Sequence, residues 1–325
     1  MKKWIRIEII LLVLVLIAVV IISINLTQQT LAPDVPDTTP STTEQSPTET
    51  TEPAPTWMTF PENRELTAEQ AFVYDCETEE FTFLLGQQDD KVYPASITKL
   101  FTAHVALQFL EPSQQITAGD ELDMVGAGSS VAGIEKGNVL TVEMLIQAML
   151  LPSGNDASYL LAVEAGRVIA EDPDLPAEEA ASRFVKEMNG QARALGMRGT
   201  HFTNPDGYHA YDHYTSHADL VVIGKLALEN ETIMKYANTS SDSVTFISGE
   251  TKSWKNTNAL IDPASVYYCP WATGMKTGQT PSAGSCLLSS FEYEGRKWVI
   301  GVFGCPEIED RFEDTLQLFN EAIGE

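Results

Sequence analysis

Strand-like segments at both ends of the folded region, with helical segments between them, constrain the fold of this chain most. Residues 71–75 and 81–85 read as two strands joined by a polar turn, and residues 273–277, 286–291 and 298–303 read as strands near the C-terminus. Such segments bury their apolar faces best within one sheet. We therefore expect an α+β fold, with one antiparallel sheet built from both chain ends, flanking helices and an inserted all-helical lobe.

The middle of the chain, from about residue 113 to residue 238, is expected to be mostly helical. Residues 96–110 contain no Gly or Pro and are apolar on most faces, which indicates a largely buried helix that ends before Pro112. Ser216 is expected to cap another helix. The complete set of expected helices covers residues 96–110, 140–151, 157–169, 176–195, 216–228 and 309–323.

The N-terminus carries a membrane-targeting pattern. Lys2, Lys3 and Arg6 precede an apolar run over residues 9–24, and no small-x-small cleavage site follows it. We therefore expect residues 1–26 to be an uncleaved signal-anchor, with the N-terminus in the cytoplasm and the rest of the chain outside. Cleavage of this segment would instead give a secreted protein.

A low-complexity segment follows the expected anchor. Residues 27–57 are rich in Thr, Pro, Ser and Glu and are too polar to offset the entropy of ordering, so we expect a disordered stalk. Residues 58–325 are then the folded domain.

The charge and cysteine content narrow the function. The formal net charge of −26 argues against nucleic-acid binding, which requires clustered Lys and Arg. None of the four cysteines has the spacing of a metal site. Cys286 and Cys305 lie in strand-like runs and are expected to be buried apolar residues.

Three short motifs follow one another along the folded region. S-x-x-K occurs once, at residues 96–99, where an apolar helix begins. Ser-Gly-Asn occupies residues 153–155, after a helix that Pro152 stops, and Lys-Thr-Gly occupies residues 276–278, on a strand. Each motif alone is common, but their order and their structural contexts together indicate one shared site.

The first motif predicts a nucleophile and its base. Serine is a poor nucleophile until a base removes its proton, and at the start of a helix the i, i+3 spacing brings Lys99 close to Ser96 Oγ. A lysine acts as a base only if burial or a second cation lowers its pKa, and Lys276 is the candidate second cation. The alternative is that Ser96 is a plain N-cap and Lys99 a solvated residue.

The second motif is expected to face the active-site cleft from a loop. Ser153 is the third catalytic candidate, relaying a proton towards the leaving amine, and Asn155 is expected to hold the substrate amide. The alternative is a Ser-Gly-Asn turn with a purely structural role.

The third motif is expected to line the opposite wall. Lys276 and Thr277 offer a cation and a hydroxyl group to a substrate carboxylate, and Gly278 allows close approach of the substrate backbone. The backbone N–H of Gln279 is expected to form an oxyanion hole with that of Ser96. The alternative is an exposed strand end.

The sequence around these motifs resembles that of the serine D-alanyl-D-alanine carboxypeptidases, which are low-molecular-mass penicillin-binding proteins of the peptidase S11 type. Residues 93–100 (Y-P-A-S-I-T-K-L) are similar to the P-A-S-x-T-K segment of this family, and residues 151–157 (L-P-S-G-N-D-A) to its S-G-N-D-A segment. Residues 202–207 (F-T-N-P-D-G) resemble its F-x-N-P-x-G loop, and residues 274–284 its G-x-K-T-G-x-T-x-x-A-G run. The resemblance covers about residues 68–323.

The resemblance implies a β-lactamase/transpeptidase-like fold with the active site between the sheet and the helical lobe. It implies that Ser96 attacks a peptidoglycan stem peptide ending in D-Ala-D-Ala, releases the terminal D-Ala and forms an acyl-enzyme that water hydrolyses. It also implies covalent inhibition by β-lactams and a reaction that needs no metal or organic cofactor.

Three departures from the family pattern matter. Some relatives have a β-rich C-terminal domain and a C-terminal amphipathic anchor; we expect neither here, because the chain ends soon after its last helix. Some carry an arginine upstream of K-T-G that helps to bind the substrate carboxylate, but the similar segment here is N-T-N at residues 256–258. Gln279 follows K-T-G where other residues are frequent.

Other functions of the same fold remain open. A class A β-lactamase deacylates through a glutamate after its second motif, but Glu164 lies in a segment that reads as helix. A D,D-endopeptidase would use the same residues, and a non-catalytic wall-binding or β-lactam-sensing module would keep the same fold.

Overall fold

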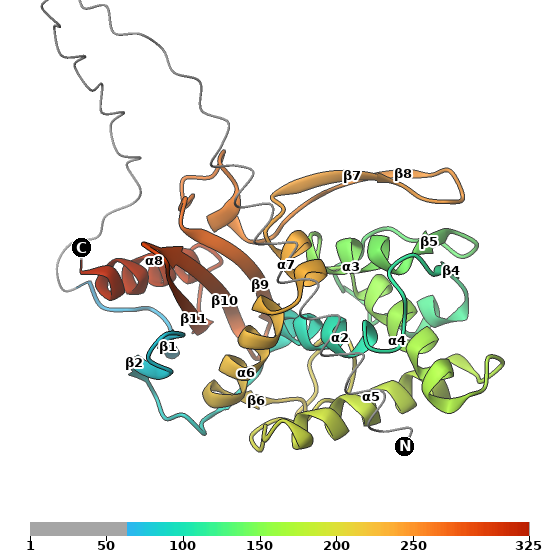
Figure 1. The fold of residues 1–325 in the computed structure, drawn as a ribbon, viewed down its shortest axis with the longest axis horizontal. Coiled ribbons are helices and arrows are strands. Elements are labelled where there is room, and N and C mark those ends of the chain that lie inside the picture. Colours follow the sequence, from blue (N-terminus) through green and yellow to red (C-terminus); the bar gives the residue numbers. More distant parts are fainter. Residues whose placement is uncertain (1–63, 325) are drawn as a thin grey trace, which may run out of the picture. The chain divides into compact units, whose positions relative to one another are not determined.

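A computed structural model describes residues 64–324, which lie in one compact unit spanning Pro53–Glu325. The described residues form a five-stranded sheet, three two-stranded sheets and a set of helices (Figure 1). The expected anchor and stalk, residues 1–26 and 27–57, lie outside the described residues. None of the helices within residues 64–324 has the length and apolar character needed to cross a membrane.

The five-stranded sheet joins the two ends of the folded region and confirms the predicted topology. Its order is β2-β1-β11-β10-β9, and every neighbouring pair is antiparallel. Its strands are β1 (Gln70–Asp75), β2 (Glu80–Leu85), β9 (Ala272–Thr280), β10 (Gly284–Tyr293) and β11 (Arg296–Cys305). The short pairs are β3 (Lys91–Val92) with β6 (Thr215–Ser216), β4 (Gln115–Thr117) with β5 (Val139–Thr141), and β7 (Ser241–Thr245) with β8 (Thr251–Lys255).

The helices of the inserted lobe lie between β3 and β7 in the sequence, and one more follows the sheet. The α-helices are α2 (Thr98–Ala106), α3 (Val142–Leu150), α4 (Asn155–Ala170), α5 (Ala177–Ala194), α6 (His217–Leu228), α7 (Glu231–Ala237) and α8 (Asp310–Ile323). Three short 3₁₀ helices are η1 (Ala95–Ile97), η2 (Asp120–Met124) and η3 (Ala259–Ile261).

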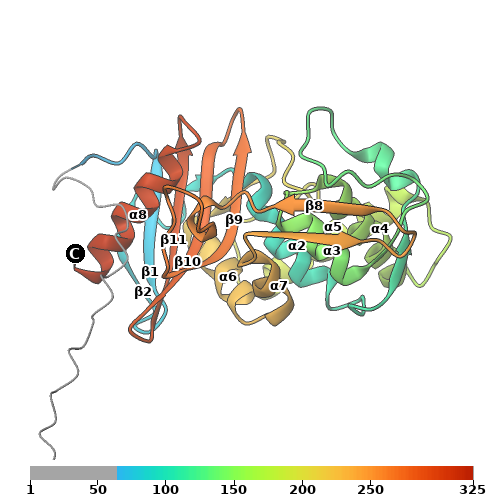
Figure 2. The ribbon, with the colours of Figure 1, turned by 90° about the horizontal axis from the view of Figure 1, so that it is seen from above.

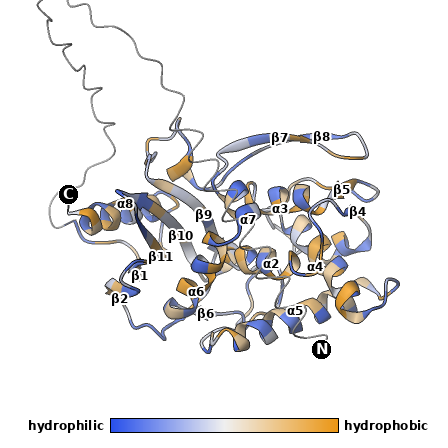
Figure 3. Cartoon of the chain, viewed as in Figure 1, coloured by the Kyte–Doolittle hydropathy of each residue, from blue (hydrophilic) through white to orange (hydrophobic). Residues whose placement is uncertain are grey.

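The sheet has a buried core on each face because its residues alternate in direction. Phe72 and Leu288 belong to the core that continues into the helical lobe, whereas Val73 and Leu287, their sequence neighbours, belong to the core under α8. Figure 2 shows α8 against the sheet and the helices α2–α5 grouped beyond β9. In Figure 3, α8 alternates between hydrophobic and hydrophilic residues, as an amphipathic helix on a sheet should.

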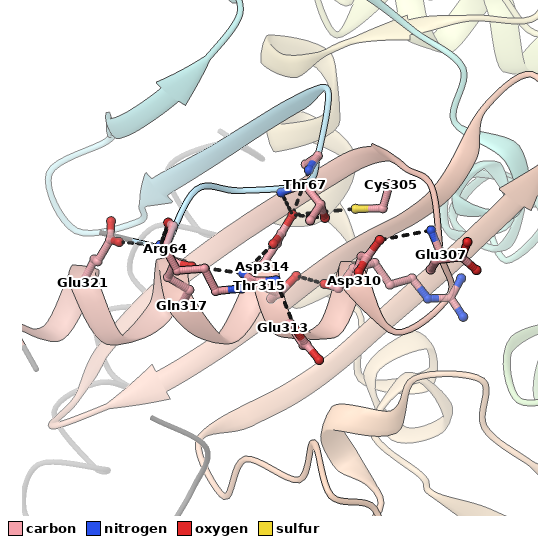
Figure 4. Close-up of polar contacts among 12 residues, drawn as sticks. Arg64, Thr67, Cys305, Glu307, Asp310, Glu313, Asp314, Thr315, Gln317 and Glu321 are labelled. Atoms are coloured by element: carbon pink, nitrogen blue, oxygen red, sulfur yellow. Dashed lines mark hydrogen bonds and ion pairs between the residues drawn. The ribbon is translucent and has the colours of Figure 1, made fainter. Parts of the chain in front are cut away.

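A buried carboxylate attaches α8 to the start of β1 (Figure 4). Asp314 is fully buried and accepts hydrogen bonds from Arg64 Nη1 at 2.7 Å, from Thr67 N and Oγ1, both at 2.9 Å, and from Ala68 N at 2.8 Å. Glu313 pairs with the same guanidinium at 3.1 Å, from a position that is one-third exposed. Because Asp314 satisfies several donors in a dry environment, it ties the C-terminal helix to the N-terminal strand.

The structure corrects three predicted boundaries. The helix predicted over residues 96–110 starts with η1 and ends at Ala106, because Gln108 N and Phe109 N bond to the carbonyl three residues back and tighten the last turn. The helix predicted to begin at Leu140 begins at Val142, since Leu140 pairs in β5 and the Thr141 side chain caps the helix. Asn155, predicted on a loop, is the first residue of α4.

Other predictions are confirmed. The Ser216 side chain caps α6 by accepting from Asp219 N at 3.2 Å. Cys286 and Cys305 are fully buried. All four cysteines are free thiols.

The β7–β8 hairpin was not predicted from the sequence, because its exposed polar residues carry little hydrophobic periodicity.

Candidate active site

The S-x-x-K motif forms a sharp turn at the start of α2. Ala95 adopts a φ of 47°, which is unusual for a residue with a side chain and costs about 1–2 kcal/mol. Ser96 follows in η1, and Lys99 Nζ lies 2.7 Å from Ser96 Oγ. The same Nζ lies 2.7 Å from the carbonyl oxygen of Asp206. The turn thus holds a hydroxyl group and an amine within proton-transfer distance.

Burial gives Lys99 the character of a base. Its side chain is fully buried, and burial lowers its pKa to about 8, against the attraction of Asp206 and Asp156. Lys276 is also fully buried, and its pKa is lowered well below the usual range by burial and by repulsion from Lys99 and Arg311. Because repulsion between cations is mutual, the pair of lysines disfavours two simultaneous charges.

Two glycines allow the chain to close around the nucleophile. A Cβ atom added at Gly207 would lie 1.8 Å from the carbonyl oxygen of Ala95 and 3.0 Å from Ser96 N. A Cβ atom at Gly278 would lie 2.7 Å from the carbonyl oxygen of Pro94 and 3.4 Å from Ser96 N. The loop that ends at Gly207 and strand β9 therefore both pack directly against the peptide groups of the turn.

A buried histidine fixes the loop before Gly207. The pKa of His213 is lowered to about 3, chiefly by burial, so the ring is neutral. Thr203 N donates to its Nδ1 at 3.2 Å, which leaves the proton on Nε2, 2.9 Å from Thr98 Oγ1. The contact links this loop to the first residue of α2, next to Lys99.

The Ser-Gly-Asn motif joins α3 to α4. Ser153 is buried with a left-handed φ of 65°, and a Cβ atom at Gly154 would lie 2.7 Å from the carbonyl oxygen of Ala148. Asn155 N donates to the carbonyl oxygen of Ser130 at 2.8 Å. The side-chain oxygen Oδ1 of Asn155 is buried without a hydrogen-bond partner among the described residues. This free acceptor is available to a substrate N–H group.

The carboxylate of Asp156 holds the neighbouring loop in place. It accepts hydrogen bonds from the backbone N–H groups of Ala132, Gly133, Ile134 and Ala157, at 2.9 to 3.0 Å. Residues 127–130, just before these contacts, line the same cavity as Ser96. Sequence reading assigned no role to this loop, whose positions are set by contacts made far along the chain.

Strand β9 carries the Lys-Thr-Gly motif, and its glycine packs against the turn that holds Ser96. Lys276 Nζ donates to the carbonyl oxygen of Thr277 at 3.1 Å and to Thr257 Oγ1 at 3.3 Å. The hydroxyl groups of Thr257 and Thr277 are 2.6 Å apart. Thr257 thus contacts both Lys276 and Thr277. Thr257 lies in the segment without the family's arginine, and its contacts were not predicted from the sequence.

An arginine from the C-terminal helix also reaches this strand. Arg311, on α8, is buried and donates from Nη1 to the carbonyl oxygen of Gly278 at 3.3 Å. Its Nε has no hydrogen-bond partner among the described residues. The cation near K-T-G is therefore Arg311, which lies 33 positions after Gly278 in the sequence. It does not come from residues 256–258.

A cavity of about 450 Å³ lies between the Ser96 turn, the start of α4 and the end of β9. Ser96, Asn155 and Gln279 line it together, whereas Lys99, Ser153, Lys276, Thr277 and Gly278 lie outside its lining. The wall between them is completed by residues 127–130, 206–209 and 280–282. Within residues 64–324, no group of three or more His, Cys, Asp or Glu side chains is arranged to hold a metal ion.

Comparison with known proteins agrees with this geometry. A family described as peptidase S11, D-alanyl-D-alanine carboxypeptidase, matches residues 57–306. The chain belongs to the peptidase S11 family. Among S11 relatives, it is 29% identical over 242 residues to the D-alanyl-D-alanine carboxypeptidase DacF of Bacillus subtilis, a match that covers 73% of this chain and 57% of DacF. The chain thus matches little more than half the length of that relative.

One further sequence relative and two solved structures are also similar to this chain. The D-alanyl-D-alanine carboxypeptidase of Streptomyces sp. K15 is 31% identical over 245 residues, covering 71% of this chain and 79% of the relative. The crystal structure of the Streptomyces K15 DD-transpeptidase superposes with a TM-score of 0.72 at 26% identity, covering 81% of this chain and 99% of that one. Penicillin-binding protein D2 of Listeria monocytogenes, in its ampicillin-bound form, superposes with a TM-score of 0.64 at 26% identity, covering 79% and 98%.

Proposed function

We propose that this S11 protein is a serine D-alanyl-D-alanine carboxypeptidase that removes the terminal D-Ala from peptidoglycan stem peptides. The observation that carries the proposal is the Lys99 amine, which is fully buried and 2.7 Å from Oγ of the cavity-lining Ser96. Lys276 and Thr277 lie on the strand that continues to Gln279, another residue of the cavity lining. The names of the relatives support the substrate class.

The acylation step follows from this arrangement. Lys99, as the neutral amine, takes the proton of Ser96 Oγ while Oγ attacks the carbonyl carbon of the penultimate D-Ala. The backbone N–H groups of Ser96 and Gln279 stabilise the oxyanion. The C–N bond breaks as the leaving amine takes a proton relayed from Lys99 through Ser153, and the terminal D-Ala departs.

Substrate binding relies on an acceptor that has no hydrogen-bond partner among residues 64–324 and on a lysine whose charged neighbours there are cations. Asn155 Oδ1 accepts the N–H of the substrate amide. Lys276 is repelled by Lys99 and Arg311, and no acidic side chain within residues 64–324 offsets this repulsion. The C-terminal carboxylate of the substrate supplies the missing negative charge, and Thr277 and Thr257 supply hydroxyl donors.

Two further properties belong to the same proposal. β-Lactams acylate Ser96 in place of the substrate, a proposal supported by the ampicillin-bound form of the Listeria relative.

Residues 1–26 anchor the chain as a single-pass membrane segment, a proposal supported by the apolar run over residues 9–24. Residues 27–57 form a stalk, and the catalytic domain, residues 58–325, lies outside the cytoplasm.

The β-lactamase alternative loses its candidate residue. Glu164 lies within α4, accepts a hydrogen bond from Gln114 at 2.9 Å and is not part of the cavity lining. Transfer to an amino acceptor deserves a separate assay, because the solved K15 relative is named a DD-transpeptidase. An endopeptidase or a non-catalytic sensor stays an outcome of the experiment below.

The test incubates the full 325-residue chain with diacyl-Lys-D-Ala-D-Ala and measures free D-Ala. We expect release by the wild type and none by Ser96→Ala. The same peptide with a C-terminal amide is the matched substrate; its leaving group is D-alaninamide, so both reactions are compared by chromatography of the shortened diacyl-Lys-D-Ala product. We expect the amide to react more slowly, since the carboxylate that Lys276 would bind is gone. Absence of D-Ala release by the folded wild type would overturn the proposal, and equal rates on acid and amide would point to an endopeptidase.

A further inference from the structure

Asp206, whose backbone contacts Lys99, carries a carboxyl group that has no role in the acylation step. The carbonyl oxygen of Asp206 accepts from Lys99 Nζ at 2.7 Å, and the next residue, Gly207, packs against the Ala95–Ser96 peptide. The Asp206 side chain is 1% exposed. Its position is therefore set by the same contacts that set the position of Ser96.

The two oxygens of this carboxyl group are used unequally. Oδ1 accepts a hydrogen bond from Tyr208 N at 3.1 Å, whereas Oδ2 is buried with no partner among the described residues. Asp206 lines the 450 Å³ cavity together with Ser96 and Asn155. A buried acceptor without a partner is costly, so an unpaired oxygen in a residue that lines a cavity points to a ligand or a water molecule as its partner.

Other carboxyl groups near the site are excluded from this role. Of the described residues that line the cavity, only Asp206 carries a carboxyl group. Asp156 faces Lys99 too, but both of its oxygens are occupied by backbone N–H groups. Glu164 accepts a hydrogen bond from Gln114 and does not line the cavity.

We propose that Asp206 is a catalytic residue of the second half of the reaction, in which Oδ2 accepts a hydrogen bond from the water that hydrolyses the acyl-enzyme. The inference rests on the proposed acyl-enzyme at Ser96. Lys99 takes one proton of this water as the water oxygen bonds to the acyl carbon. The bond from that carbon to Ser96 Oγ then breaks, and Lys99 returns the proton to Oγ. The carboxylate orients the water and is unchanged at the end.

The charges around Asp206 are compatible with this role. Burial raises the pKa of Asp206 above its usual value, and the nearby Lys99 and the backbone N–H of Tyr208 limit this rise. The Tyr159 phenol faces Asp206 from α4, and burial and the Asp206 charge both raise its pKa, so it stays protonated. Lys276 and His213 face Lys99, the former as a repelling cation and the latter as a neutral ring.

The experiment separates formation of the acyl-enzyme from its hydrolysis. The full chain and its Asp206→Asn variant are mixed with benzylpenicillin, and intact-protein mass spectrometry follows the gain and then the loss of the adduct. The amide keeps an oxygen for Tyr208 N but replaces the free acceptor with a donor. We expect adduct formation within about threefold of the wild type and adduct loss slowed by about tenfold or more. Asp212→Asn, an exposed carboxylate in the same loop, is the matched control and should leave both rates unchanged.

Each outcome decides a different statement. A wild type that forms no adduct and releases no D-Ala contradicts the proposed function itself. A wild type that forms the adduct, with Asp206→Asn losing it at the wild-type rate, overturns only the inference about Asp206. A folded Asp206→Asn that cannot form the adduct also overturns it. Asp206→Ser, which keeps one acceptor, is the second variant, and failure of both variants to fold would assign Asp206 to folding instead.

Discussion

At the scale of single residues, burial is the feature that turns ordinary side chains into reactive ones. Lys99 lies on a helix that is apolar on most faces, so its ammonium form is removed from water. The loss of hydration lowers the pKa of the amine. Asn155 and Asp206 both line the cavity, and each has one buried oxygen without a hydrogen-bond partner among residues 64–324. These groups cost stability in the free protein and can be satisfied only when a ligand or water enters.

The pKa of Lys99 makes acylation depend on pH. The neutral amine is the active form, so the rate of acylation should increase as pH rises through a midpoint of about 8 and then level off. Because Lys99 and Lys276 repel each other, the midpoint belongs to the pair. The measurement is the second-order rate of adduct formation with benzylpenicillin between pH 6 and pH 9.5, with circular dichroism at each pH as the control for folding. A rate that is constant over this range would contradict Lys99 as the base.

At the scale of elements, the site depends on contacts between segments that are distant in the sequence. The turn that carries Ser96 packs against β9 and against the loop ending at Gly207, and α8 contributes Arg311 to the strand of the third motif. The position of α8 is in turn fixed by Asp314 (Figure 4). Stability at this helix therefore also affects the geometry of the site.

The two carboxylates of α8 that bind Arg64 should differ in their contribution to stability. Asp314→Ala leaves the backbone N–H groups of Thr67 and Ala68 without their acceptor and removes one of the partners of Arg64, so it is expected to lower the free energy of unfolding by about 3 kcal/mol. Glu313→Ala removes a one-third-exposed partner of the same guanidinium and should cost less than about 1 kcal/mol. Urea denaturation of both variants checks this, and equal losses would show that burial of Asp314 is not what stabilises the contact.

At the scale of the whole described unit, the sheet and the inserted helices meet at the cavity. Its lining comes from the turn at Ser96, the loop at residues 127–130, the loop at residues 206–209 and the end of β9. A group attached to Ser96 therefore faces both the sheet and the helical lobe.

Acylation should protect segments from both parts of the unit. After reaction with benzylpenicillin, we expect slower amide hydrogen exchange in residues 127–130 and in residues 279–282, measured by mass spectrometry. The adduct fills the cavity and restricts both walls, so protection should extend beyond the attachment point. Ser96→Ala, which cannot be acylated, is the control and should show neither effect. Protection limited to peptides that contain Ser96 would contradict a shared cavity.

The sheet built from both chain ends, the inserted helices and the proximity of Ser96 to Lys99 could all be predicted from the sequence. These features depend on hydrophobic periodicity and on spacing within one helix, which are local properties. The contacts of Thr257, Arg311 and Asp206, and the helical placement of Asn155, became clear only from the folded structure. The F-T-N-P-D-G loop was recognised in the sequence, but whether the second oxygen of Asp206 has a partner depends on which distant segments pack around it. Packing between segments up to about 250 positions apart leaves no periodic signal in the sequence, and it is this packing that sets burial, hydrogen-bond partners and charge.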